Sequence, residues 1–369
     1  MEKKNVPKIR FPGFTEPWEQ RKLEDIVDFL DTQRKPLEGA KRVNGPYPYY
    51  GASGIVDYVN GYLFDEELIL FSEDGANITD RNYPISFLAS GKYWVNNHAH
   101  VLKTKKGYEN NFVCNSLERK DYTPYNTGMA MPKLNQEVCR NIPVMCPKYE
   151  EQKKIGDYFR NLDNLIFLHH RKLENLKKQK KGLLQKMFPE KGKKVPEMRF
   201  PEFTNDWEQR KLSEITTTIE TGKSKFQSKD SGLYEILGST SVIGYDDSYD
   251  YEGDFLLTAR VGANAGNLYK YSGKVKISDN TVFIQCDNIN FIYYLLMKSD
   301  IKKLSFGTGQ PLVKASELKE QNLLIPTSKD ERIKIGIFFE KIDNLISLYQ
   351  RKLEHLQKQK KALLQQMFV

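Results

Sequence analysis

The sequence predicts an α+β protein in which two similar domains alternate with two long helices, and the simplest packing partner for one long helix is the other. Three observations favour this fold class. A long stretch is written twice, at 150–188 and 330–368, with a constant offset of 180 residues. A shorter arm recurs at 6–26 and 195–215. Between arm and helix, both halves carry short β-branched and aromatic runs bounded by Gly, Asn and Asp, which are typical of strands and turns.

The longer repeat has the composition of a helix. It is rich in Leu, Lys, Gln and Glu, and each copy has no proline and one early glycine. Apolar residues recur in alternating steps of four and three, which predicts a heptad seam with one interrupting lysine in each copy. At about 1.5 Å per residue, each helix could reach nearly 60 Å. The predicted seam consists of Ile166, His169, Leu173, Leu176, Lys180, Leu183, Met187, Ile346, Tyr349, Leu353, Leu356, Lys360, Leu363 and Met367.

The arm contains RFP-x-F-T followed by WEQRKL in both copies. Thr15 in the first copy, and Asn205 and Asp206 in the second, can cap a helix that follows. Leu23, Ile26 and Val27 have the spacing of a helix face that docks on a core. The repeat therefore sets an order of arm, variable segment and long helix, which the chain follows twice.

These repeats divide the chain into four regions. The first arm and domain occupy 1–149, and the first long helix occupies 150–188. A linker, the second arm and the second domain occupy 189–329, and the second long helix occupies 330–369. Within the domains we expect strands at Leu68–Phe71, Tyr93–Val95, Ala99–Leu102, Phe255–Thr258, Val275–Ile277 and Thr281–Ile284, and a helix at Phe291–Leu304.

Composition limits the class of protein. The formal net charge is +9, but the excess lies on the helices and the first arm, so it is weak evidence for a nucleic-acid partner. There is no run of eighteen apolar residues and no apolar signal-peptide core. The four cysteines form no CxxC pair, which fits a reducing compartment. We expect a cytoplasmic protein without membrane contact.

The residues predict no catalytic site and no metal site. A phosphate-binding loop ending at Ser224 would need a glycine where Thr217 stands. His98 and His100 alternate as on one face of a strand, but no Cys or carboxylate accompanies them at ligand spacing. Phe306–Gly309 lacks the tetrapeptide that accompanies the glycine loop of methyltransferases, so we expect a tight turn.

The doubled arm RFP-x-F…WEQRKL and the doubled helix DNLI…RKLE…KQKK…LLQ-x-MF resemble the conserved regions of the specificity subunit of type I restriction–modification enzymes. Gly307–Pro311, GTGQP, also resembles a motif of that family's variable domains. The first segment departs from it with GMAMP at Gly128–Pro132, so no glutamine role is assigned to Met131. The resemblance covers essentially the whole chain.

This resemblance implies a non-catalytic DNA-binding subunit whose two long helices pack as an antiparallel coiled coil with pseudo-two-fold symmetry. Each variable domain would be a target-recognition domain that reads one half of a split double-stranded DNA target. Two methyltransferase (modification) subunits would dock on the helices, and restriction (motor and nuclease) subunits would join them. S-adenosylmethionine, ATP and Mg would be bound by those partners, with no cofactor in this chain.

Base edges are read by short polar and charged side chains, usually on loops. At an offset of 187, Glu73 occupies the place of Arg260. A carboxylate can accept from the cytosine amino group, whereas Arg can donate two bonds to guanine, so the domains would prefer different bases. The DNA-binding candidates are Ser53, Glu73, Asp74, Asn77, Lys92, Asn96, Asn97, His98, Ser239, Thr240, Arg260, Asn264, Lys276, Asn280 and Gln310.

Other interpretations remain open. Tyr49, Tyr50, Tyr58, Tyr93 and Trp94 could stack on a splayed base, but we favour core positions for them. The whole chain could instead be a non-catalytic coiled-coil adaptor whose variable domains bind proteins, which sequence-specific DNA binding by the assembled complex would exclude. An enzyme with its own methyltransferase or nuclease centre would require activity of the isolated chain.

Overall fold

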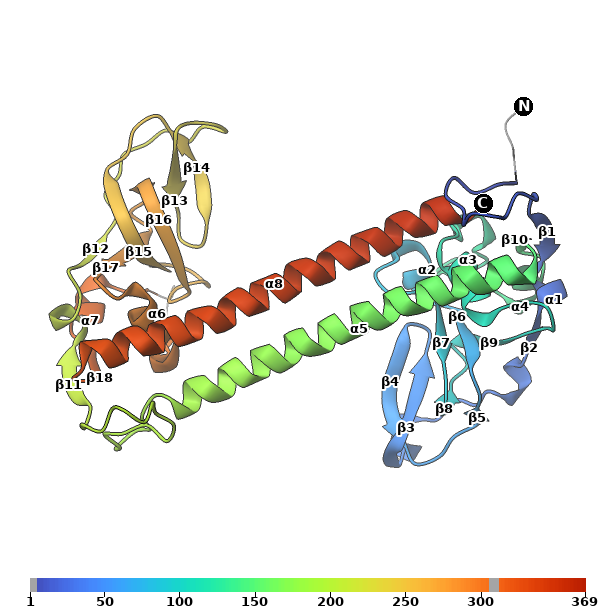
Figure 1. Ribbon diagram of the computed structural model, residues 1–369, viewed down its shortest axis with the longest axis horizontal. Coiled ribbons are helices and arrows are strands. Elements are labelled where there is room, and N and C mark those ends of the chain that lie inside the picture. The colour runs from blue at the N-terminus through green and yellow to red at the C-terminus, as the bar shows by residue number, and fades with distance from the viewer. Residues whose placement is uncertain (1–4, 305–311) are drawn as a thin grey trace. The chain divides into compact units, whose positions relative to one another are not determined.

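The computed structural model describes residues 5–304 and 312–369, and the chain forms two compact units. The first unit comprises Met1–His170 and Arg351–Val369, and the second comprises Arg171–Gln350. The chain passes between the units within two long helices, α5 (Tyr149–Lys186) and α8 (Lys329–Met367). Each unit therefore contains one arm, one α+β domain and a part of both long helices (Figure 1).

The first unit has small sheets covered by short helices. Its elements before α5 are β1 (Glu19–Lys22), α1 (Leu23–Ile26), β2 (Val27–Phe29), β3 (Asn44–Gly51), β4 (Gly54–Val59), β5 (Phe64–Asp65), β6 (Leu68–Ser72), α2 (Asn77–Asp80), β7 (Ser86–Ala89), β8 (Lys92–Val95), β9 (Ala99–Thr104), α3 (Asn110–Glu118), α4 (Gln136–Arg140) and β10 (Pro143–Cys146). Two four-stranded sheets have the orders β2-β9-β6-β7 and β4-β3-β8-β5. The pairing of β3 with β8 is parallel.

The second unit repeats this plan with longer strands. Its elements are β11 (Glu208–Lys211), β12 (Thr218–Thr221), β13 (Tyr234–Leu237), β14 (Val242–Asp246), β15 (Tyr251–Ala259), β16 (Leu268–Ile277), β17 (Thr281–Gln285), α6 (Ile289–Ser299), α7 (Ala315–Lys319) and β18 (Asn322–Ile325). One six-stranded sheet has the order β12-β17-β15-β16-β13-β14. Gly253 pairs with Gly273 in β15 and β16, and both have positive φ, so the long strands can bend without a break.

The predicted α+β fold class is confirmed, and each predicted strand overlaps an observed one. Two local predictions are wrong. The predicted helix at Phe291–Leu304 is interrupted, because Asp300 adopts a left-handed conformation after α6 and a 3-10 turn follows at Ile301–Leu304. In the arm, EQRK forms the strands β1 and β11, which pair with β10 and β18, so no helix starts at a cap on Thr15 or Asn205. The helix begins later: α1 covers Leu23–Ile26 and buries Leu23 and Ile26, and a 3-10 turn covers Leu212–Glu214 in the second copy.

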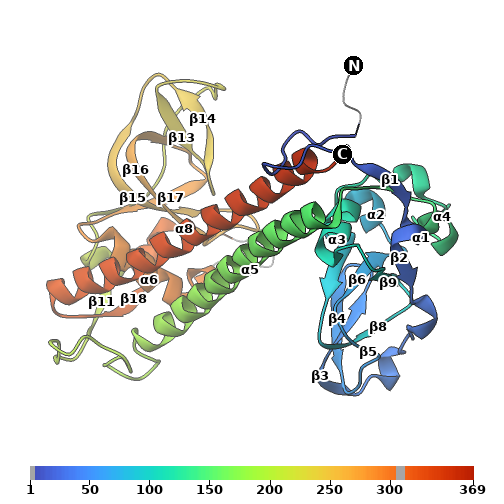
Figure 2. The same ribbon diagram turned by 45° about the vertical axis from the view of Figure 1, so that its right-hand side comes forward.

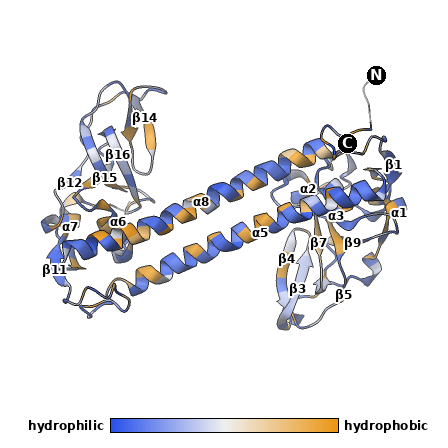
Figure 3. Cartoon of the chain, viewed as in Figure 1, coloured by the Kyte–Doolittle hydropathy of each residue, from blue (hydrophilic) through white to orange (hydrophobic). Residues whose placement is uncertain are grey.

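The predicted seam residues of both long helices are all buried or half-buried. In each unit the interrupting lysine meets an aspartate of the other helix: Lys180 Nζ lies 2.6 Å from Asp343, and Lys360 Nζ lies 2.6 Å from Asp163. The two ion pairs are the same contact at the 180 offset, and their order shows that the helices run antiparallel. In the cartoon of Figure 3, most residues of α5 and α8 are coloured as hydrophilic, with hydrophobic residues spaced along both helices. None of the described helices is apolar enough to span a bilayer.

Each arm packs against the end of a long helix from the other half of the sequence. In the first unit Trp18 makes an edge contact with Phe368, with ring centroids 6.1 Å apart. In the second unit Trp207 makes the same contact with Phe188 at 5.9 Å. Figure 2 shows the arm strand β1 close to the chain's C-terminus, as this packing requires.

A buried ion pair fastens each arm to the start of the long helix that follows it. Arg10 donates two hydrogen bonds to Glu151, at 2.6 and 2.8 Å, and Arg199 donates two to Glu331, at 2.7 and 2.8 Å. Both glutamates are almost completely buried. A buried carboxylate is stable only when it is paired in this way, which explains why the RFP arginine recurs with the arm.

The early glycine of each long helix marks a close contact with the domain. A Cβ at Gly156 would lie 2.0 Å from the Glu109 carboxylate, which accepts a bond from Phe112 N at the start of α3. We expect Gly156→Ala to lower the unfolding free energy by about 1–3 kcal/mol through overpacking. Gly182→Ala is the matched control, because nothing lies within 4 Å of its Cβ, and should raise it by up to ~1 kcal/mol. Chemical denaturation followed by circular dichroism measures both; equal effects would contradict the close contact.

Candidate nucleic-acid interface

Four loop segments meet at one end of the first domain. The parallel strands β3 and β8 end side by side, so the turn at 52–53 and the loop at 96–98 lie at the same sheet edge. Glu73 N donates to His98 O at 2.9 Å, and this bond joins the loop after β6 to the loop at 96–98. Leu134 N donates to Glu73 O at 2.7 Å, and this bond joins the loop before α4 to the loop after β6. Loops held by a rigid sheet edge are a usual place for recognition residues.

The second domain builds the same cluster on the parallel pair β13 and β16. Arg260 N donates to Asn280 O at 2.9 Å, and Val313 N donates to Arg260 O at 2.8 Å. These are the backbone bonds that Glu73 makes in the first domain. Glu73 and Arg260 therefore occupy equivalent places in three dimensions, with opposite charge.

The first-domain loops surround a hollow of about 510 Å³. Six of the predicted DNA-binding residues line it: Ser53, Asp74, Asn77, Asn96, Asn97 and His98. Arg42 and Val56, which we did not predict, also line it. Lys92 is not brought to this group, because it lies at the other end of β8, with its ammonium 4.8 Å from the centre of the Tyr62 ring.

Several of these side chains already have partners within the domain. The Asn77 amide accepts from Tyr83 N at 2.7 Å and donates to Tyr83 O at 2.9 Å, so it shapes its own loop. His98 Nδ1 lies 2.9 Å from both carboxylate oxygens of Asp74, while half of the His98 side chain is exposed. An Asp partner on Nδ1 fixes the orientation of the ring.

Glu73 belongs to a buried charge cluster with Asp31 and His100. His100 Nδ1 lies 2.7 Å from Asp31, and its Nε2 lies 2.8 Å from Leu134 O. The Arg34 guanidinium lies 2.6 Å from Glu73 and 3.5 Å from Asp31. The three groups have the residue types of a metal site, but Arg34 already supplies a cation to both carboxylates.

Asp31 is the acidic centre of this cluster. Burial opposes its ionisation, but the hydrogen bond and charge of His100, the Val101 N–H and the Arg34 charge together hold the pKa of its carboxyl below the usual value. These bonds tie the start of the domain to β9 and to the loop before α4. Sequence spacing gave no signal for Arg34, because its partners lie in other segments of the chain.

The DNA-binding candidates of the second domain do not all line one hollow. Ser239 Oγ donates to Asn280 O at 3.1 Å, and the half-buried Arg260 donates to Asp279 O at 3.3 Å. Asn264 accepts from Asn267 Nδ2 at 3.1 Å. Thr240 lines a separate hollow of about 460 Å³ together with residues 266–269 and α6.

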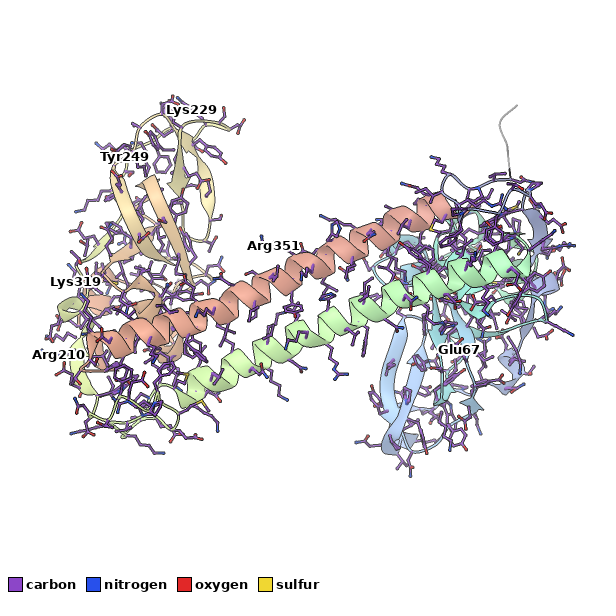
Figure 4. All side chains as sticks on the ribbon, in the orientation of Figure 1. Glu67, Arg210, Lys229, Tyr249, Lys319 and Arg351 are labelled. Carbon is purple, nitrogen blue, oxygen red and sulfur yellow. The ribbon has the colours of Figure 1, made fainter. Side chains whose placement is uncertain are left out.

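Two further candidates of the second domain lie outside this cluster. Lys276 is a buried residue of strand β16, with Nζ 3.3 Å from Asp250. Gln310 and the GTGQP motif lie outside the described residues. Val313, two residues after the motif, makes the cluster contact with Arg260. Figure 4 labels Lys229 and Tyr249 at the end of this domain that carries β14.

Some of the aromatic candidates are buried and others are at least partly exposed. Tyr49 and Tyr93 are buried, as we favoured for them, and the Tyr49 hydroxyl accepts a bond from Leu37 N. Trp94 Nε1 donates to Lys35 O at 2.6 Å. Tyr58 is half-exposed on β4.

The family model of the type I restriction modification DNA specificity domain matches this chain twice, at residues 15–178 and 204–358. The chain belongs to this family. The specificity subunit is the non-catalytic component that gives type I restriction–modification enzymes their DNA specificity. The two matches each contain one of the loop clusters described above.

Full-length relatives agree with this assignment. A type I restriction enzyme specificity subunit of Methanocaldococcus jannaschii is 24% identical over 98% of this chain and 93% of its own length. A specificity subunit of Haemophilus influenzae is 36% identical over 37% of this chain, and that match spans only 35% of the Haemophilus protein. The crystal structure of an S subunit from M. genitalium has the same fold, with a TM-score of 0.76, 15% identity and 99% coverage of both chains.

Proposed function

We propose that this specificity subunit reads a bipartite, asymmetric double-stranded DNA target with a fixed gap, one half with each recognition domain. The observation that carries this proposal is the loop cluster, which is built twice on equivalent backbone bonds with different side chains. A repeated scaffold suits two half-sites, and side chains that differ at equivalent places suit two different base sequences. The reversal from Glu73 to Arg260 is the clearest of these differences.

The Glu73 and Arg260 side chains differ in how far each is already paired within its own domain. Glu73 is held by Arg34 at 2.6 Å and by Lys133 at 3.3 Å, so its carboxylate is largely neutralised. Arg260 has one described hydrogen bond from its guanidinium, to a backbone carbonyl. Its remaining donors suit guanine O6 and N7, the most common arginine contact in the major groove.

The proposed partners are two modification subunits, which dock on equivalent faces of the long helices. Leu165 and Leu168 on α5 are 47% and 55% exposed, and Leu345 and Leu348 on α8 are 44% and 39% exposed. These residues are related by the 180 offset and lie outside the seam. Apolar residues that recur on an exposed helix face indicate a protein interface, and two equal faces suit two copies of one partner.

The remaining partner functions follow from this assembly. Restriction subunits complete the complex, and S-adenosylmethionine, ATP and Mg are bound by the modification and restriction subunits. Because DNA and these cofactors are used in the cytoplasm, we place the assembled enzyme there.

The test is methylome sequencing of a methylation-free host that expresses this chain with its cognate modification subunit. We expect one new split motif with methylated adenine in each half and a fixed gap. The same host with the modification subunit alone is the control. A stable purified complex that produces no new motif would refute the proposed DNA recognition and favour an adaptor role.

Arg260→Ala is expected to relax the preference for one base pair of the second half-site. Loss of a bidentate contact to guanine should reduce discrimination at that position by about 1–3 kcal/mol, with little change at the others. Binding of the complex to duplexes with every single substitution measures this. Lys229→Ala is the matched control, because Lys229 is an exposed cation of the same domain that pairs with Asp247. Uniform weakening across all sequences would assign Arg260 to a phosphate instead.

A further inference from the structure

A methyl group and an amide donor lie next to each other in the hollow of the first domain. A Cβ added at Gly51 would lie 2.7 Å from Val56 Cγ2 and 3.2 Å from Asn96 Nδ2. Glycine at this position therefore lets both side chains converge on the same point. Val56 and Asn96 both line the hollow that the proposed recognition loops surround.

The Asn96 side chain can act only as a donor in this hollow. It is 6% exposed, and its Oδ1 accepts a bond from His98 N at 2.8 Å. Within the described part of the chain, its Nδ2 makes no hydrogen bond. Because Asn96 lines the hollow, this free N–H donor is available to a ligand there, and a ligand with an acceptor atom would pair with it.

Val56 supplies the complementary apolar surface. It is 58% exposed on β4, an edge strand that pairs only with β3 among the described strands. A β-branched residue that is half-exposed on a sheet edge contributes little to the core. Its methyl groups are available to a ligand beside the Asn96 amide.

Thymine is the base that fits this pair. In the major groove it presents the O4 acceptor next to the C5 methyl group, whereas cytosine presents an amino donor in place of O4. Adenine and guanine offer acceptors but no methyl group. An amide that only donates, next to a valine, therefore favours thymine over the other three bases.

We propose that Asn96 and Val56 read one thymine of the first half-site, with Asn96 Nδ2 donating to O4 and Val56 packing against the C5 methyl. This inference rests on the proposed function and adds to it the base and the two residues that select it. His98 and Asp74 flank the same hollow and would fix the neighbouring backbone.

The second domain has an apolar side chain at the place of Val56 but no amide donor at the place of Asn96. A Cβ at Gly238 would lie 2.4 Å from Ile243 Cγ2, as Gly51 does with Val56. The residue equivalent to Asn96 is Ser278, which is buried and has its hydroxyl 3.2 Å from the Thr281 hydroxyl. Ile243→Ala is therefore a matched control for Val56→Ala.

The test uses the complex of the full chain with its modification subunit and a duplex that carries the split motif found by methylome sequencing. Each thymine of the first half-site is replaced in turn by deoxyuridine, which lacks only the methyl group. We expect wild-type affinity to fall about fourfold at one thymine, the effect of one buried methyl group. With Val56→Ala this difference should disappear, and with Ile243→Ala it should persist.

A second variant tests the amide without relying on the methyl group. Asn96→Asp keeps the acceptor for His98 N and replaces the donor with an acceptor. Affinity for the thymine duplex should fall roughly tenfold, and cytosine at that position should restore part of it. If this variant does not fold, the deoxyuridine comparison with wild type and Val56→Ala decides alone.

The outcomes separate this inference from the proposed function. A split motif whose first half-site shows no thymine-to-deoxyuridine effect, or the same effect in wild type and Val56→Ala, overturns the thymine contact and leaves DNA recognition intact. The absence of any split motif overturns both. A deoxyuridine effect that depends on Val56 supports the contact.

Discussion

Replacing Leu165 and Leu168 together with aspartate is expected to remove one of the two modification subunits from the complex. The same change at Leu345 and Leu348 should remove the other, and the combined variant should lose both. Native mass spectrometry of the purified complex would count the subunits. Methylome sequencing of the same strains should show loss of the split motif in the combined variant.

The size of this effect follows from the side chains involved. Fully burying one exposed leucine contributes about 1.5–3 kcal/mol; because these side chains are already about half buried, a pair contributes about 1.5–3 kcal/mol to docking. Docking would also bury the aspartate carboxylates against an apolar surface of the modification subunit, which adds the cost of desolvating these charges. The variant itself should remain folded, because these four leucines lie on the exposed faces of the helices.

Charge alone must be separated from loss of the apolar face. Lys178→Asp with Lys181→Asp is the matched control, since both lysines are exposed on α5 at the same three-residue spacing. This control changes the charge more than the leucine variant and should leave both modification subunits bound. Retention of both subunits by the combined leucine variant would show that docking occurs elsewhere.

The repeats made much of the architecture predictable. A helix that keeps its sequence at an offset of 180 must form the same contacts twice, and the seam follows from heptad spacing alone. The role of the lysines at 180 and 360 did not follow from that spacing. Each is neutralised by an aspartate of the antiparallel helix, and the pairing depends on register between segments far apart in the chain.

The residue types of the recognition loops could be predicted from the sequence, but their burial and their partners could not. Loop residues of the right chemistry were predicted, and the sheet edge does gather six of them in the first domain. Alternation could not show that Lys276 is buried in β16, or that Asn77 is occupied by Tyr83. Spacing predicted the short helix that contains Leu23 and Ile26, but it did not predict the strand β1 before it, because the partner strand β10 is remote in sequence.

A chain truncated after Phe188 is expected to form a homodimer that recognises a symmetric target. Phe368, which directly follows α8, packs against Trp18, Phe112 and Phe159 of the first unit. The truncated chain lacks α8, so these aromatic residues would be exposed to water. The segment 183–188 differs from 363–368 only at position 186, so a second copy can supply the missing side chains.

The contacts of the second unit show that this substitution is sterically possible. There Phe188 already packs against Trp207, Phe291 and Phe339, the equivalents of Trp18, Phe112 and Phe159. Lys180 of one copy would also pair with Asp163 of the other, as Lys360 does in the intact chain. Each copy would thus complete the first unit of its partner with chemistry that the chain already uses.

Multi-angle light scattering should give a mass of twice the truncated chain, and methylome sequencing with the modification subunit should give two inverted copies of the first half-site. Exchanging Met187 and Phe188 for serine in the truncated chain is the control, because it removes the side chains that fill the partner's aromatic cluster, and should abolish the dimer. A stable monomer of the unmodified truncation would mean that the first unit folds without the end of a long helix. A dimer that tolerates the serine exchange would place the contact elsewhere. The symmetric motif is the more demanding outcome, since it requires that the first domain alone determines its half-site, as the separate loop clusters of the two domains imply.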